Sequence, residues 1–169
     1  MAEISIADLA YTAGIVDGEG CILVSHQPTR YKGHNPERIG VVYRSYYCRV
    51  AVSMTDSVVV PWLYKNFGGS LCRDKIAYRG SNALFENRWI VATGDAEPFL
   101  RAIYPYLKLK QRQAKIALRF CVLKRLAAKA RAKNNPRSRG SHATPVSFQR
   151  QFGLCKQQIV AERARLKAA

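Results

Sequence analysis

The sequence has 169 residues, enough for one domain with a hydrophobic core of its own. Its 28 Lys and Arg against 11 Asp and Glu give a formal net charge of +17, which favours a polyanionic partner and nucleic acid first. The five cysteines and three histidines stand singly, without metal-ligand or C-x-x-C spacing, so neither a zinc site nor a disulfide framework is indicated. No apolar run reaches the length of a membrane span and no signal pattern opens the chain, so we expect an intracellular protein with no membrane partner.

The first predicted element is a helix over residues 6–17. Ser5 and Asp8 form a capping-box pattern at its start, and Gly18 and Gly20 end it. Ala10 and Gly14 share a face that is almost without side chains, which invites close packing of a partner helix. Asp17 and Glu19 lie among the unpaired carbonyls of the last turn, an environment that suits a hard divalent cation.

Two hairpins follow the helix. A strand over 21–27, a basic loop over 29–40 and a strand over 41–53 form the first hairpin, with Tyr46, Cys48, Val50 and Val52 expected on its core face. Thr55 or Asp56 can cap a helix to Phe67, in which Pro61 implies a kink or a late start. The second hairpin is predicted from strands over 70–79 and 84–93.

The last third of the chain is predicted to be helical and basic. Asp95 is a candidate N-cap for a short helix to residue 106, and a longer helix reaches about residue 129. No Asp or Glu occurs between Pro98 and Ala161, so this half is expected to face phosphate. We expect one domain over 1–169, with a core at about 5–130, a basic loop at 131–145 and a C-terminal helix at about 146–167.

The string Ala13-Gly-Ile-Val-Asp-Gly-Glu-Gly20 resembles the signature of the LAGLIDADG homing endonucleases. The resemblance implies an α+β fold, αββαββα with an antiparallel saddle-shaped sheet, to which C-terminal helices are added here. It also implies that Glu19 and the Gly18 carbonyl hold a metal ion. Family members more often have Asp at the position of Glu19. Asp17 is then a structural residue near the helix end.

Two further positions are compared with the family. The segment 107–113 resembles a family segment whose basic residue projects towards the scissile phosphate. This resemblance makes Lys110 a candidate catalytic residue. The alternative is that Lys110 is a surface lysine at a helix start, with its aliphatic stem packed on the surface. Relatives often carry a basic or amide residue at the end of the second strand. Here either Ser53 fills that catalytic role or the pocket is built differently.

The motif occurs once in the sequence, so two copies are expected to pair through the first helix about a two-fold axis. The residues assigned to this homodimer interface are Ala10, Ala13, Gly14 and Asp17. The resemblance then implies site-specific, Mg²⁺-dependent cleavage of double-stranded DNA, with Mn²⁺ able to substitute. A near-palindromic target of the intron-homing type, cleavage across the minor groove and short 3′ overhangs follow from the same resemblance.

Basic and polar side chains of the two hairpins and the long helix are assigned to DNA contact, Arg being suited to guanine and Gln to adenine. The assigned residues are Ser25, Gln27, Arg30, Lys32, Arg38, Arg49, Arg73, Lys75 and Arg88 for sequence reading, and Lys108, Arg112 and the segment 129–139 for phosphate. Two alternatives remain open at this point. One is a maturase that binds intron RNA, and the other is a basic RNA- or DNA-binding protein without enzymatic activity.

Overall fold

The computed structural model describes residues 4–30, 42–76, 84–92, 94–134 and 146–168. In chain order the elements are α1 (Ile6–Gly18), β1 (Gly20–Arg30), β2 (Val42–Met54), α2 (Val59–Phe67), β3 (Ser70–Ile76), β4 (Leu84–Ala92), α3 (Ala96–Ile103), the 3-10 helix η2 (Tyr104–Tyr106), α4 (Gln111–Asn134) and α5 (Val146–Ala168). Every predicted helix and strand is present. The loop over 31–40, the turn between the strands of the second hairpin and most of the basic loop lie outside the described residues.

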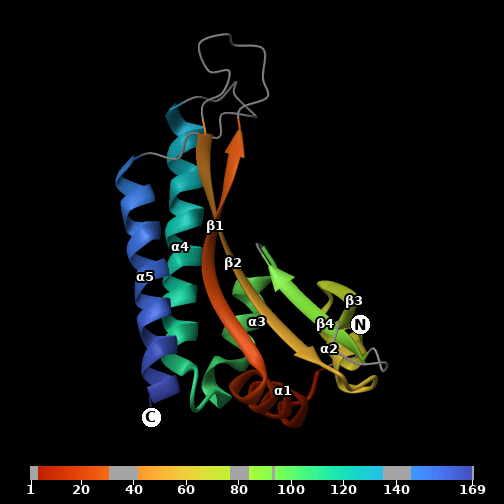
Figure 1. The fold of residues 1–169 in the computed structure, drawn as a ribbon. Helices are drawn as coiled ribbons and strands as arrows, with labels where there is room; N and C mark the ends of the chain where they lie inside the picture. The colour runs from red at the N-terminus through yellow and green to blue at the C-terminus, as the bar shows by residue number, and fades with distance from the viewer. Residues whose placement is uncertain (1–3, 31–41, 77–83, 93, 135–145, 169) are drawn as a thin grey trace.

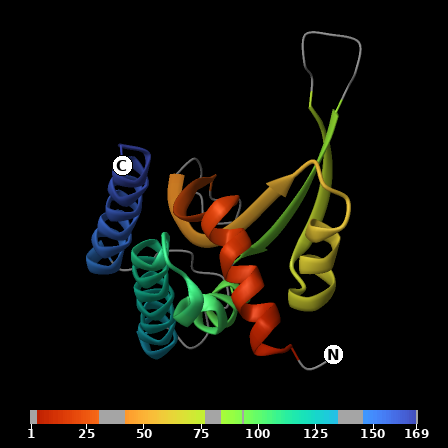
Figure 2. The same ribbon diagram turned by 90° about the horizontal axis from the view of Figure 1, so that it is seen from below.

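The four strands form one antiparallel sheet in the order β1-β2-β4-β3. The helices cover one face of this sheet, with α1 crossing below it between α2 and the pair α3 and α4 (Figures 1 and 2). Because side chains alternate along a strand, alternate residues of β1, β2 and β4 enter the core. Ile22, Val50, Val52, Trp89 and Val91 are all fully buried on that face, and the core face predicted for the second strand is confirmed.

An aromatic cluster joins α2 and α3 to the sheet. The rings of Phe67, Trp89 and Phe99 lie with centroids 5.1–6.4 Å apart, and Trp89 Nε1 donates to the Gly68 carbonyl at 2.7 Å. This bond satisfies the one polar atom of a buried indole. Gly68 and Gly69 have φ of 67° and 90°, so the turn into β3 requires residues without a Cβ.

Two helix starts differ in how they are capped. The Asp56 carboxylate accepts from the amides of Val58 and Val59 at 2.8 and 2.6 Å, and these bonds lower its pKa. The helix therefore starts late, with Pro61 in its first turn, where a missing N–H costs no hydrogen bond. Asp95 stands at the N-cap of α3, but its side chain makes no capping bond.

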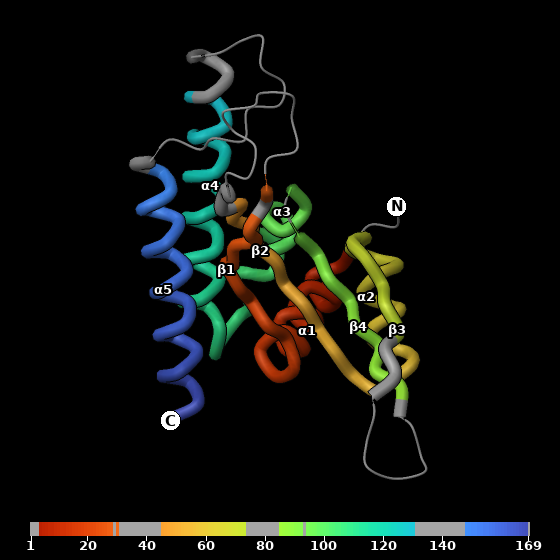
Figure 3. Tube along the Cα trace, turned by 45° about the horizontal axis from the view of Figure 1, so that its top comes forward, coloured from red at the N-terminus to blue at the C-terminus, as the bar shows by residue number. Residues whose placement is uncertain are grey.

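The C-terminal helices extend the core beyond the sheet. α4 runs to Asn134, past its predicted end, and α5 lies beside it along the edge strand β1 (Figure 3). Phe152 of α5 contacts the rings of Tyr46 on β2 and Phe120 on α4, with centroids 5.6 and 5.0 Å apart. Lys156 Nζ lies 3.0 Å from His26 Nδ1 of β1. None of the helices in the described part of the chain is both long and apolar enough to cross a membrane.

Candidate active site and nucleic-acid interface

The acidic end of the motif lies at the corner between α1 and β1. Glu19 is the C-cap of α1, and its own amide bonds back to the carbonyls of Ile15 and Val16. Its side chain is exposed. A carboxylate is thereby held at the end of a helix and directed away from the core, where a ligand can reach it.

Asp17 points into the protein and performs a different task. One carboxylate oxygen accepts from the amides of Lys108 and Leu109 at 2.6 and 3.1 Å, and the other accepts from the Lys110 amide at 2.8 Å. These amides lead into the N-terminus of α4, where a negative charge is favourable. The structural role expected for Asp17 is consistent with these contacts.

Lys110 contacts the end of α1 at the same corner. Its Nζ donates to the carbonyls of Val16, Asp17 and Gly18 at 2.8, 2.6 and 3.3 Å, and so caps the C-terminal end of α1. Burial lowers the pKa of the ammonium, while the negative charges of Asp17 and Glu19 act in the opposite direction. A lysine at an unfavourable helix start therefore gains a favourable position at the end of another helix.

The oxygen atoms at this corner fit a hard divalent cation, but one chain supplies few of them. The Glu19 side chain is exposed, and the Gly18 carbonyl beside it accepts from Lys110 Nζ at 3.3 Å. Both are oxygen ligands of the type that Mg²⁺ prefers. Within the described residues, no three Asp, Glu, His or Cys side chains gather into a metal-binding group.

The bare face of α1 is present in the structure. Ala10, Gly14 and Gly18 are exposed, and a Cβ added at either glycine would meet no atom within 4 Å. Two of the residues assigned to the dimer interface lie elsewhere, because Ala13 is fully buried in the chain's own core and Asp17 binds the amides before α4. The exposed face of small residues therefore consists of Ala10, Gly14 and Gly18.

The sheet face turned away from the helices has no fully buried side chain in the described part of the chain, and we call it the open face. Its members are Cys21, Leu23, Ser25, Gln27, Ser45, Tyr47, Arg49, Ala51, Ser53, Ser70, Cys72, Glu86, Arg88, Ile90 and Ala92. Arg49 Nε is buried on this face without a hydrogen-bond partner in the described structure. Such a donor is costly unless a ligand supplies an acceptor.

The sheet register shows on which face of the sheet each residue assigned to DNA reading lies. Ser25, Gln27, Arg49 and Arg88 lie together on the open face. Arg30 alternates onto the helix-covered side at the end of β1. Lys32 and Arg38 lie outside the described residues.

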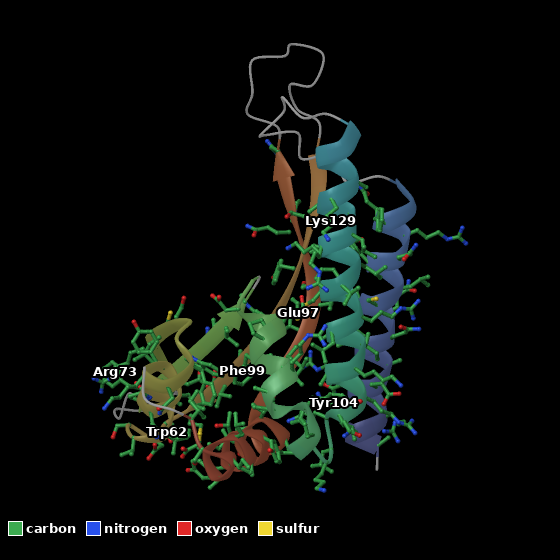
Figure 4. The ribbon with its side chains drawn as sticks, turned by 180° about the vertical axis from the view of Figure 1, so that it is seen from behind. Trp62, Arg73, Glu97, Phe99, Tyr104 and Lys129 are labelled. Atoms are coloured by element: carbon green, nitrogen blue, oxygen red, sulfur yellow. The ribbon has the colours of Figure 1, made fainter. Side chains whose placement is uncertain are left out.

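Arg73 does not lie on the open face, because its strand partner is Asn87 and not Glu86 or Arg88. Its guanidinium is stacked 4.5 Å from the centroid of the Phe85 ring at the outer edge of the second hairpin (Figure 4). Lys75 pairs with Phe85 in the register, and its side chain is outside the described part.

Ser53 lies beside the motif corner, in contact with a residue that sequence reasoning did not link to it. Val52 pairs with Gly20 at the start of β1, and Ser53 follows it at the end of β2. Arg88 Nε donates to Ser53 Oγ at 3.2 Å, and Arg88 Nη2 pairs with Glu86 at 3.0 Å. This link depends on the pairing of β2 with β4, two strands separated by a helix and another strand, for which the sequence has no local signal.

The residues assigned to phosphate lie near the start of α4. Lys108 is exposed at the motif corner, whereas Arg112 faces α5, where its guanidinium lies 4.0 Å from Glu162. Arg112 lines a groove of about 540 Å³ between α4 and α5, together with Lys115, Arg119 and Gln158. Sequence reasoning did not single out Lys115 and Arg119, although their spacing from Arg112 places all three on one side of α4.

No family model matches the sequence, and no curated protein matches it. The structure is, however, similar to solved structures of homing endonucleases in complex with DNA. I-CvuI bound to its target is matched over 92% of this chain and 82% of that one, with a TM-score of 0.56 and 18% identity. I-SmaMI, a LAGLIDADG homing endonuclease, bound to uncleavable DNA is matched over 90% of this chain and 45% of that one, with a TM-score of 0.58 and 13% identity.

The group I intron-encoded enzyme I-CeuI gives a third match, over 82% of this chain and 65% of that one, with a TM-score of 0.50 and 12% identity. At these identities the likeness establishes the fold. This chain has the fold of the LAGLIDADG homing endonucleases, and the α+β architecture expected from the motif is confirmed.

Proposed function

We propose that this protein is a homodimeric, site-specific DNA endonuclease of the intron-homing type that requires a divalent metal ion. The observation that carries the proposal is the position of Glu19, an exposed carboxylate at the end of a helix whose outer face is bare. The fold that surrounds this helix is also found in I-CvuI and I-SmaMI, whose structures were solved with bound DNA.

The dimer is supported by the single motif and by the open space at Gly14 and Gly18. Small residues allow two helix backbones to approach closely, and a two-fold axis through this face would bring two motif ends together. This chain covers 45% of the I-SmaMI chain, so that chain is long enough to contain a second unit of this size.

The residues at the motif end would share the work of phosphodiester hydrolysis. Glu19 and the Gly18 carbonyl would hold Mg²⁺, for which Mn²⁺ could substitute, and the ion would supply charge stabilisation and a more acidic bound water. Lys110 Nζ lies beside these oxygens, where it donates to the carbonyls that end α1, and it would act as a second catalytic residue. Its ammonium group would partly offset the negative charge of Glu19 near the phosphate.

The open face would lie along the major groove, where Gln27 and Arg49 could reach base edges. With two such faces about a two-fold axis, the target would be nearly palindromic, and both strands would be cut across the minor groove to leave short 3′ overhangs. Lys108, at the motif corner, would contact phosphate.

The test is incubation of the purified protein with intron-free host-gene DNA that spans the insertion site, in Mg²⁺ or in EDTA. We expect a double-strand cut in Mg²⁺ that is lost in EDTA and in Glu19→Gln, while this variant still binds the DNA. Asp95→Asn is the matched control, because this exposed carboxylate makes no capping bond and should not affect cutting. Full cutting by Glu19→Gln would rule out its assigned role.

RNA binding is the second candidate function, and the groove between α4 and α5 favours it. Arg112, Lys115 and Arg119 line this groove on a side of the molecule formed by helices and not by the open face. If the groove binds intron RNA, Lys115→Gln with Arg119→Gln should weaken RNA binding and leave DNA cutting unchanged. Equal losses of RNA and DNA binding would argue against a separate RNA surface.

A further inference from the structure

The end of β2 next to the motif carries no basic or amide side chain of its own. Ser53 is followed by Met54, Thr55 and Asp56, and none of them can offer a cation to a phosphate. The register nevertheless brings a cation to this place from β4. Val52 of β2 pairs with Gly20 of β1 and with Trp89 of β4. The next residue of β2, Ser53, pairs with Arg88 of β4.

Arg88 and the motif end are therefore close in the sheet. Arg88 lies one residue beyond the row formed by Gly20, Val52 and Trp89, and only β2 lies between it and the motif end. Paired strands lie about 4.8 Å apart. Both Ser53 and Arg88 belong to the open face. A long guanidinium side chain on this row can span the distance of one strand towards the motif corner.

Among the described residues, the Arg88 guanidinium contacts both Ser53 and Glu86. Nε donates to Ser53 Oγ at 3.2 Å, and Nη2 pairs with the Glu86 carboxylate at 3.0 Å. The Arg88 side chain is still 40% exposed, so it remains within reach of a ligand on the open face. Contacts at both Nε and Nη2 of one planar group restrict its orientation, which is the condition for effective electrostatic stabilisation of a transition state.

We propose that Arg88 is a catalytic residue that contacts the scissile phosphate, with Ser53 and Glu86 as its positioning residues. This role deepens the proposed nuclease function and depends on it. In hydrolysis a water oxygen attacks phosphorus, the bond to the leaving oxygen breaks, and that oxygen takes up a proton. The non-bridging oxygens gain negative charge as this happens, and the Arg88 guanidinium would stabilise that charge through charge-assisted hydrogen bonds.

Arg73 is the matched control for Arg88. It belongs to the same hairpin and carries the same charge, but it lies on the opposite side of the sheet and stacks on Phe85. A general loss of positive charge would affect both variants alike. A specific contact with the reacting phosphate would affect only Arg88.

The experiment measures single-turnover cleavage at saturating protein, on a DNA that the wild type cuts, beside DNA affinity measured without metal. For Arg88→Ala we expect a rate about 100-fold lower, with affinity changed by less than about threefold. Added methylguanidinium should restore part of the lost rate, because it replaces the missing group. Ser53→Ala should lower the rate by about tenfold through looser positioning, and Arg73→Ala should retain the wild-type rate.

Each other outcome overturns the proposal. If Arg88→Ala cuts at the wild-type rate, Arg88 is not catalytic. If it loses affinity or base preference at an unchanged saturating rate, Arg88 reads sequence instead. If Arg88→Ala melts at a lower temperature and methylguanidinium restores no activity, its role is structural. A wild-type protein that cuts no DNA refutes the proposed function itself, a result that does not depend on any Arg88 variant.

Discussion

Asp17 and Lys110 cap each other's helices. The Asp17 carboxylate accepts from the amides of residues 108–110 before α4, and the Lys110 ammonium donates to the carbonyls of residues 16–18 that end α1. Each charge lies at the helix end whose dipole it complements. The two segments that resemble the homing endonuclease family therefore form one unit, which fixes the position from which Glu19 projects.

The first prediction concerns Asp17. Asp17→Asn replaces one acceptor oxygen by an NH₂ group and removes the charge, so part of the amide cluster loses its partner. Hydrogen bonds to charged groups contribute about 1.5–3 kcal/mol, and we expect the free energy of unfolding to fall by about 2 kcal/mol. Urea denaturation measures this change. Asp95→Asn should leave stability unchanged, because Asp95 makes no capping bond, and an equal loss in both variants would contradict the explanation.

The second prediction follows from the pKa of Lys110, which burial lowers below its ordinary value of 10.5. Between the folded-state pKa and 10.5 the unfolded chain binds more protons at this position, so this residue makes stability rise with pH in that window. The free energy of unfolding of the wild type relative to Lys110→Met should therefore increase from neutral pH towards pH 10.5. Urea titrations of both proteins at several pH values measure the difference. A decrease in this difference over the same range would show that the charges of Asp17 and Glu19 affect the pKa of Lys110 more than burial does.

The third prediction separates the dimer from the fold of the protomer. Gly14 has open space where a Cβ would be, so Gly14→Leu should leave the melting temperature of the protomer nearly unchanged and abolish dimerisation. At Gly20 an added Cβ would lie 2.6 Å from the Val16 carbonyl oxygen, so Gly20→Ala should destabilise the protomer itself. Sedimentation velocity and thermal melting distinguish the two effects. A Gly14→Leu protein that remains a dimer would refute the helix-face interface.

Local patterns were sufficient to predict most of the fold. The capping pair Ser5 and Asp8 and the alternation along β2 each depend on residues close in sequence, and each is found in the structure. The alternation of β2 also identified its core face correctly, because burial on one face imposes a period of two.

Contacts between distant segments could not be predicted in the same way. Arg73 was assigned to DNA reading because it is basic and lies in a hairpin, but the face it occupies depends on the pairing of β3 with β4. The contact of Arg88 with Ser53 likewise depends on the register between β2 and β4. Ala13 could not be distinguished from Ala10 or Gly14 by size alone, since the side of α1 that enters the core is set by α3 and the sheet.

The fourth prediction concerns Thr12, which is fully buried in α1 and whose hydroxyl has no hydrogen-bond partner in the described structure. Thr12→Val keeps the branched shape and removes the unsatisfied polar group, which costs about 1–3 kcal/mol in proteins. We expect the free energy of unfolding to rise by about 1 kcal/mol. Thermal and urea denaturation measure it, and Thr12→Ala should instead destabilise because it leaves a cavity. A less stable Thr12→Val would mean that the hydroxyl has a partner after all.

The fifth prediction concerns Arg49, whose replacement should have opposite effects on the stability of the protomer and on its affinity for DNA. Its Nε is buried on the open face without a partner, so Arg49→Met should leave the protomer equally stable or up to about 1 kcal/mol more stable. DNA affinity should nevertheless fall, and the slope of log affinity against log salt should decrease by about 0.9 if Arg49 contacts a phosphate. If Arg49 instead contacts a base, this slope will be unchanged and the base preference at one position of the target will be weaker.

Arg125 provides the comparison for Arg49, because its guanidinium pairs with Glu97 at 3.2 Å on the helix side of the molecule. Arg125→Met should lower stability slightly and leave DNA affinity unchanged, the reverse of the pattern expected for Arg49→Met. Fluorescence anisotropy over a salt series, with urea denaturation of the same samples, measures both quantities. If Arg49→Met and Arg125→Met change affinity equally, the open face contributes only its share of net charge, and the burial of Arg49 Nε has no connection with DNA.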